Sequence, residues 1–146
     1  MKIIKVIFLD IDGVVNSEET LKRTKGGILG IDPYLVSIFN RIIFATDAKI
    51  VLSSSWRHSK EGRDEVRQQI MDFIDVTPRM PLLGGSETME RGKEIKAWLD
   101  KHPEVEKYAI LDDDSDFLPD QPLFKTTWKK GLTEEIAKEV IKHLNN

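Results

Sequence analysis

The first apolar segment of the chain predicts a strand that is buried on both faces. Residues 3–9 form a short, β-branched and almost continuous apolar run, interrupted only by Lys5. Such a run is typical of a strand in a parallel sheet whose two faces are covered by helices. Shorter runs predict further strands at residues 49–52, 73–76, 107–111 and 124–126.

Segments with helical periodicity alternate with these strands. Asp32 and Pro33 predict a helix start, because Asp is a favourable N-cap and proline is tolerated at the first helical position. This helix should end near Asp47. Further helices are expected over residues 60–72, from Arg91 to about His102, and after Thr133, which can act as an N-cap. Polar stretches with several glycines predict loops at residues 14–31 and 77–89.

Strands that alternate with helices predict a three-layer, Rossmann-like α/β fold. Its central sheet should be mainly parallel, with helices on both faces. The length of 146 residues matches one domain, so we expect residues 1–146 to form a single unit. Ligands of such sheets bind at the carboxyl ends of the strands, where this chain places its acidic and hydroxyl residues.

Composition narrows the range of functions. The net charge of -3 gives no global attraction to nucleic acids or anionic membranes, and the absence of cysteine excludes disulfides and thiolate chemistry. No segment approaches the roughly 20 apolar residues of a membrane-spanning helix. We therefore expect a cytoplasmic protein that does not associate with membranes, and the sequence indicates no obligate protein partner.

Two carboxylates follow the first predicted strand. Asp10 and Asp12 lie two residues apart, and Gly13 permits a sharp turn after them. A carboxylate can attack phosphorus and hold the phosphoryl group, while a second can protonate the leaving oxygen and later deprotonate water. We assign the first role to Asp10 and the second to Asp12. The alternative interpretation of the tetrapeptide is an ordinary turn.

A second acidic cluster follows the strand predicted at residues 107–111. Residues 112–116 contain four aspartates, which would repel Asp10 at the same sheet edge unless a cation joined them. Mg²⁺ fits, because it prefers oxygen ligands and typically uses one or two carboxylates. Asp112 and Asp113 are both candidate ligands. The alternative is an acidic surface loop.

Hydroxyl and cationic side chains supply the remaining candidates. Ser53, directly after the second strand, can donate to a phosphoryl oxygen, as Ser54 can with its amide. Arg57 could hold a second phosphate or form a surface ion pair. Lys93, at a helix start, could neutralise Asp10 and the phosphoryl group, and Arg91 and Lys96 are alternatives for this cationic role.

In chain order, these motifs resemble the four motifs of the haloacid dehalogenase (HAD) superfamily. The strings at residues 51–57, 91–95 and 131–133 are similar to HAD domains of RNA repair proteins. The resemblance implies an Mg²⁺-dependent phosphatase with Asp10 as nucleophile and Asp12 as general acid/base. It also implies metal ligands from the Asp10 carboxylate, the Asp12 backbone carbonyl and a carboxylate of the last motif, Asp112 or Asp113.

The resemblance also bears on the substrate. Many HAD enzymes cover small substrates with a cap that is inserted after the first or the third motif region. Neither of the two corresponding segments of this chain is long enough for a sizeable folded cap. An open site favours an accessible phosphate on a large molecule, such as a nucleic-acid or nucleotide end. Lys22, Arg23, Lys25 and Arg57 could then follow a phosphate backbone.

Two other functions are compatible with parts of the sequence. A non-catalytic HAD-like module could bind a partner, although every motif position has a competent residue. A phospho-accepting receiver domain also combines acids, a hydroxyl and a lysine on a parallel sheet. Receiver domains carry the phospho-accepting aspartate on a later strand, however, whereas Asp12 here follows Asp10 by two residues and could hydrolyse the adduct.

Overall fold

A computed structural model describes residues 2–79 and 90–146 of the chain. Its centre is a five-stranded sheet in the order β3-β2-β1-β4-β5, and all four neighbouring pairs are parallel. The strands are β1 (Ile4–Leu9), β2 (Lys49–Leu52), β3 (Asp75–Val76), β4 (Val105–Asp112) and β5 (Leu123–Lys125). This arrangement confirms the predicted α/β, Rossmann-like fold with a parallel sheet.

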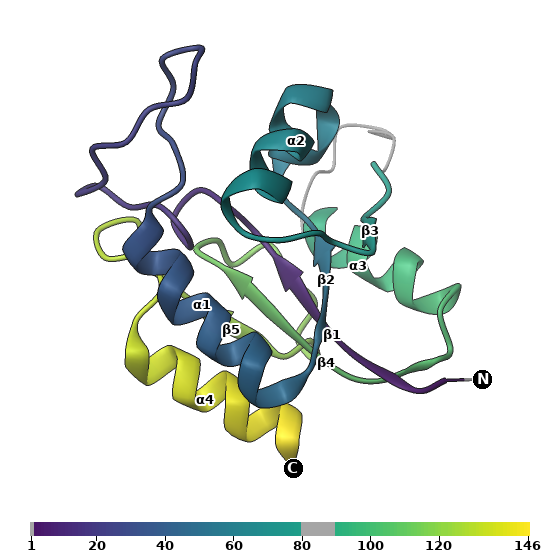
Figure 1. Ribbon diagram of the computed structural model, residues 1–146. Helices are drawn as coiled ribbons and strands as arrows, with labels where there is room; N and C mark the ends of the chain where they lie inside the picture. Colours follow the sequence, from purple (N-terminus) through teal and green to yellow (C-terminus); the bar gives the residue numbers. More distant parts are fainter. Residues whose placement is uncertain (1, 80–89) are drawn as a thin grey trace.

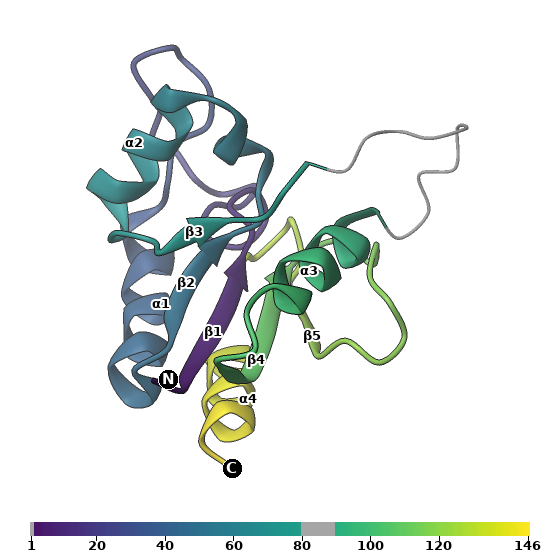
Figure 2. The same ribbon diagram turned by 90° about the vertical axis from the view of Figure 1, so that its right-hand side faces the viewer.

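Helices cover both faces of the sheet. They are α1 (Pro33–Thr46), the short 3₁₀ helix η1 (Ser55–His58), α2 (Lys60–Gln69), α3 (Glu90–Asp100) and α4 (Glu134–Asn145). Helices α1 and α4 pack against each other on one face, as Figure 1 shows. Figure 2 shows α3 on the opposite side of the sheet from α1, so the domain has three layers.

Two apolar clusters separate these layers. The larger one joins α1 and α4 to side chains of the sheet such as Ile7 and Leu52. The smaller one joins Ile95 and Trp98 of α3 to the other face of the sheet, which includes Phe8. Because both faces are apolar, β1 is buried from Val6 to Leu9, which explains its almost continuous hydrophobic run.

The helix ends follow the predicted capping signals. The Asp32 side chain accepts a hydrogen bond from the Tyr34 amide at the start of α1, and Asp47 ends the helix in the left-handed conformation. The Thr133 hydroxyl caps α4 in the same way. Sequence signals at helix termini therefore located both ends of α1 and the start of α4 to within a residue.

Some element boundaries differ from the prediction. Helix α2 ends at Gln69, β3 has only two residues, and β4 extends two residues further than expected at its start. The expected loop at residues 77–89 lies mostly outside the described residues. Residues 10–32 contain a single isolated bridge, between Arg23 and Leu29, which agrees with the absence of a sizeable cap in this segment.

None of the described helices has both the length and the apolar character needed to cross a bilayer.

Candidate active site

Four neighbouring strands end at the same level and place polar residues side by side. The last residues of β3, β2 and β1, and their partner on β4, are in register, namely Val76, Leu52, Leu9 and Leu111. The next residue of each strand is polar, which gives the row Thr77, Ser53, Asp10 and Asp112. Backbone hydrogen bonds continue the sheet ladder through this row, for example from the Ser53 amide to the Leu9 carbonyl.

The side chains of this row lie on the face of the sheet that α3 covers. Side chains of a strand alternate between its two faces. Two positions before the row, β1, β2 and β4 contribute to the apolar cluster beneath α3, with Phe8, Val51 and Ile110. The row therefore projects toward the first turn of α3, which carries Arg91.

Three carboxylates converge at the β1 and β4 end of the row. Oxygen atoms of Asp10, Asp112 and Asp113 all lie within 4.8 Å of one another. Asp10 and Asp112 are buried, and Asp113 is half-buried. This all-oxygen set is the ligand type that Mg²⁺ prefers, so the residues present fit a magnesium ion.

Burial and mutual repulsion perturb both buried carboxyls. Burial raises the pKa of Asp112 to about 8, and the neighbouring Asp10 charge contributes to the increase. Burial also raises the pKa of Asp10, although the positive charge of Arg91 opposes this change. One arginine therefore does not compensate the negative charge of the cluster, and a divalent cation would stabilise the ionised carboxylates.

Arg91 is the cation that contacts the cluster. One of its terminal nitrogens lies 3.2 Å from an Asp10 oxygen and 3.1 Å from an Asp112 oxygen. Burial lowers the pKa of Arg91, but the charges of Asp10 and Asp112 outweigh burial and raise it overall. The Lys93 side chain is exposed. The structure thus brings Arg91, and not Lys93, to the carboxylates.

The Asp12 side chain is exposed but held in place. One carboxylate oxygen accepts a hydrogen bond from Asn16 Nδ2 at 2.9 Å, and the other accepts one from the Trp56 indole at 3.2 Å. Asn16 Oδ1 also accepts a hydrogen bond from the Gly13 amide, so Asn16 fixes the turn that carries Asp12. An exposed carboxylate with a fixed orientation can exchange protons with a bound molecule and with solvent.

Close backbone packing explains two glycines of the motifs. Gly13 has a φ of +83°, and a Cβ at this position would collide with the Asp113 carboxylate. Thr126 fixes the same turn by donating its hydroxyl to the Gly13 carbonyl. A Cβ at Gly92 would come within 2.8 Å of the Leu118 amide nitrogen. Glycine at position 13 therefore lets the two acidic loops approach each other closely, and glycine at position 92 lets α3 approach the segment before β5.

The loop after β2 holds a buried hydroxyl. Ser53 is 1% exposed, and among the described residues its Oγ has no hydrogen-bond partner. Its neighbour Ser54 is also buried, but the Ser54 hydroxyl caps η1 by accepting the Trp56 amide. Ser53 therefore has an unused donor beside Asp10, whereas the Ser54 hydroxyl is engaged.

Arg57 is buried beneath this loop and is not on the surface. Its guanidinium donates to the carbonyl oxygens of Ser53, Ser54 and Thr77 at 2.9–3.1 Å. It also forms an ion pair with Glu94 of α3 at 3.0 Å, in which both side chains are 5% exposed. All three guanidinium nitrogens are therefore engaged with the protein, and Arg57 joins the ends of β2 and β3 to α3.

The sequence analysis did not identify the residues that hold the site together, among them Asn16, Trp56, Glu94 and Thr126. One signal was available on α3. Positions three and four residues apart share a helix face, so the buried pair Ile95 and Trp98 extends back to Arg91 and Glu94 but not to Lys93. The helix period therefore distinguishes the two cations.

A parallel α/β sheet with an aspartate cluster at the carboxyl ends of β1 and β4 agrees with a HAD-like domain. The model of the family described as "HAD domain in Swiss Army Knife RNA repair proteins" matches residues 6–137, and the chain belongs to this family. Membership indicates a domain of phosphatase type, and such domains generally use a metal ion. No curated protein matches the chain significantly.

Proposed function

We propose that the chain is an Mg²⁺-dependent phosphomonoesterase that works through an aspartyl-phosphate on Asp10. The observation that carries this proposal is the set of polar groups around Asp10 at one edge of the sheet. The Ser53 hydroxyl lies on the adjacent strand on one side, Asp112 lies on the other, and Arg91 contacts both carboxylates. These groups are a nucleophile, a hydrogen-bond donor to the phosphoryl group, a metal ligand and a cation.

The reaction has two steps. An Asp10 oxygen attacks phosphorus, the bond between phosphorus and the leaving oxygen breaks, and Asp12 gives its proton to that oxygen. Asp12 then removes a proton from water, which attacks phosphorus and releases inorganic phosphate and the free Asp10 carboxylate. The hydrogen bonds from Asn16 and Trp56 support this role, because they hold the Asp12 carboxylate beside the Asp10 strand.

Arg91 fills the cationic role in this proposal. Its contacts with Asp10 and Asp112 place it where negative charge accumulates as the phosphoryl group is bound. Ser53 donates its buried hydroxyl to a phosphoryl oxygen, and the Ser54 backbone amide is a second donor candidate. Arg57 is better placed to position this loop than to bind substrate, because its nitrogens already bind carbonyl oxygens and Glu94.

Mg²⁺ would be held by the carboxylates of Asp10, Asp112 and Asp113, together with the Asp12 backbone carbonyl. Both Asp112 and Asp113 are within the cluster, so both are candidate ligands. When bound, the ion supplies positive charge that neutralises substrate phosphate and the cluster. The raised pKa values of Asp10 and Asp112 support a requirement for such a charge.

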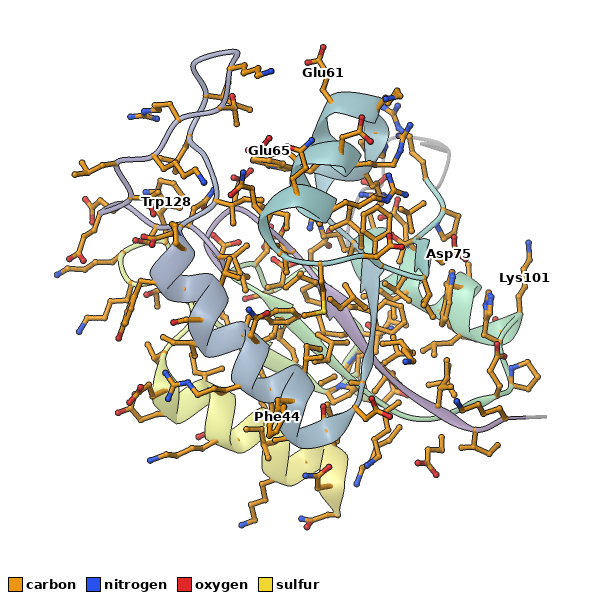
Figure 3. The ribbon with its side chains drawn as sticks, viewed as in Figure 1. Phe44, Glu61, Glu65, Asp75, Lys101 and Trp128 are labelled. Carbon is orange, nitrogen blue, oxygen red and sulfur yellow. The ribbon has the colours of Figure 1, made fainter. Side chains whose placement is uncertain are left out.

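The proposed substrate is an accessible phosphate at a nucleic-acid or nucleotide end. The family description refers to RNA repair proteins. The loop at residues 14–31 carries exposed Lys22, Arg23 and Lys25. Trp128 is 46% exposed and is followed by Lys129 and Lys130, and its carbonyl accepts a hydrogen bond from the Glu18 amide at the base of this loop (Figure 3). Basic side chains beside an exposed aromatic ring suit a single strand, because they bind phosphates and stack bases.

The test is phosphate release from an aryl phosphate and from 3′- and 5′-phosphorylated oligonucleotides, with Mg²⁺ and with excess chelator. We expect metal-dependent release from the aryl phosphate and faster release from one oligonucleotide end. If no substrate is hydrolysed, the alternative is a HAD-like module that binds its partner without catalysis. A stable phosphoprotein formed without turnover would instead support a receiver-type role.

We also propose that the protein is located in the cytoplasm.

A further inference from the structure

Thr77 carries a buried hydroxyl for which the proposed reaction has no use. The residue is 2% exposed, and within residues 2–79 and 90–146 its Oγ1 has no hydrogen-bond partner. In the described part of the chain, Ser53 Oγ is the other buried side-chain oxygen or nitrogen atom without a hydrogen-bond partner. A buried hydroxyl without a partner is unfavourable, so native structures keep few of them, and each calls for an explanation such as a bound water, a bound ion or a functional role.

The two hydroxyls lie on adjacent strands and on the same face of the sheet. The Thr77 amide donates to the Leu52 carbonyl at 3.0 Å, which extends the ladder between β2 and β3 beside Ser53. Asp75, which is labelled in Figure 3, lies two residues before Thr77 and accepts a hydrogen bond from the indole of Trp98 on α3 at 2.8 Å. Because side chains alternate along a strand, Thr77 also faces α3.

Thr77 is too far from Asp10 for its hydroxyl to contact the phosphoryl group that is transferred to Asp10. Adjacent strands lie about 4.8 Å apart, so Thr77 is roughly 10 Å from the Asp10 strand, with Ser53 between them. A substrate group that bound the Thr77 hydroxyl would therefore differ from the transferred phosphoryl group. It would lie on the side of Ser53 that is away from the carboxylate cluster.

An exposed cation follows Thr77 in the chain. Arg79 is exposed two residues after Thr77. Burial lowers the pKa of the nearby His58, and the positive charges of Arg57, Arg79 and Arg91 lower it further. Glu94 neutralises Arg57 by an ion pair, which leaves Arg79 as an exposed cation here. Hydroxyl donors beside a cation favour an anion.

We propose that Thr77 and Arg79 form a second anion subsite, which binds a second phosphate of the substrate beside the phosphoryl group held at Asp10 and Ser53. This inference rests on the proposed function and adds a substrate requirement to it. A molecule with two phosphates then binds more tightly than a matched molecule with one, and Thr77 carries part of the difference.

The test uses the Thr77→Val variant, which removes the hydroxyl and keeps the shape, with Thr77→Ser as the matched control that keeps a hydroxyl. Both are made in an Asp10→Asn background so that bound ligand is not hydrolysed. Calorimetry measures binding of a nucleoside 3′,5′-bisphosphate and of the corresponding 5′-monophosphate, each with Mg²⁺. We expect Thr77→Val to weaken bisphosphate binding by about tenfold or more, with monophosphate binding unchanged and Thr77→Ser close to the parent.

Two results would overturn the subsite. One is equal affinity of the parent and Thr77→Val for the bisphosphate, and the other is an equal loss for both nucleotides. Thermal unfolding without nucleotide gives a second readout. Loss of a hydroxyl that lacks a partner should not lower the melting temperature, whereas a clear decrease without a change in binding would indicate a structural role. Hydrolysis of an aryl phosphate by the wild type tests the proposed function separately, because that substrate has only one phosphate.

Discussion

The buried ion pair between Arg57 and Glu94 gives the sharpest stability prediction. Both side chains are 5% exposed and their charged atoms are 3.0 Å apart. Glu94→Ala leaves the guanidinium buried without its counter-charge, although its bonds to three carbonyl oxygens persist. Removing one partner of a buried pair costs about 3–5 kcal/mol. For a chain of this length, that loss lowers the melting temperature by roughly 10–16 °C.

The matched control lies on the same helix. Lys96 and Asp100 form an ion pair at 3.1 Å, but their side chains are 61% and 62% exposed. Lys96→Ala should therefore cost less than about 1 kcal/mol. Urea unfolding with excess chelator measures both free energies without a contribution from bound metal.

Glu94→Gln separates charge from hydrogen bonding. It keeps an acceptor for Arg57 but removes the negative charge, so its free energy of unfolding should lie between those of the wild type and Glu94→Ala. If Glu94→Ala lost no more stability than Lys96→Ala, the buried pair would not be the connection between α3 and the ends of β2 and β3 that we describe.

Two further predictions concern the site. Arg91→Met should lower kcat/KM for an aryl phosphate by about a hundredfold, whereas Lys93→Met changes it less than about twofold, and the reverse order would contradict the assignment of Arg91. The pKa of Asp112 rises from 3.8 to about 8 in the folded chain, so its contribution to stability is complete below pH 3.8 and is lost as the pH rises to about 8. With chelator, unfolding free energies across this range should fall less for Asp112→Asn than for the wild type, and equal slopes would refute the shift.

Local patterns were sufficient to predict most of the fold. The buried run of β1, the Asp32 cap of α1 and the Thr133 cap of α4 depend on short-range preferences that are visible in the sequence. The order of strands in the sheet and the two-residue length of β3 depend on tertiary packing. Short edge strands carry little hydrophobic signal, so their bounds could not be set from the sequence.

The site was predictable where a motif directly follows a strand. Asp10, Ser53 and Asp112 meet because parallel strands end at one edge, and this argument needs only the sequence. The environment of Arg57 was not predictable, because its burial depends on Glu94, which is distant in the sequence. Thr77 also escaped notice, since its importance arises from the register of β3 with β2.

The most direct test of the central claim is phosphate release by wild type and Asp10→Asn, each with Mg²⁺ and an aryl phosphate. The variant should be folded, with an unfolding free energy in chelator close to or above that of the wild type, because burial disfavours the charged Asp10 side chain. We predict that wild type releases phosphate and that the variant releases it only at the uncatalysed rate. Equal turnover by the folded variant would contradict a nucleophilic role for Asp10.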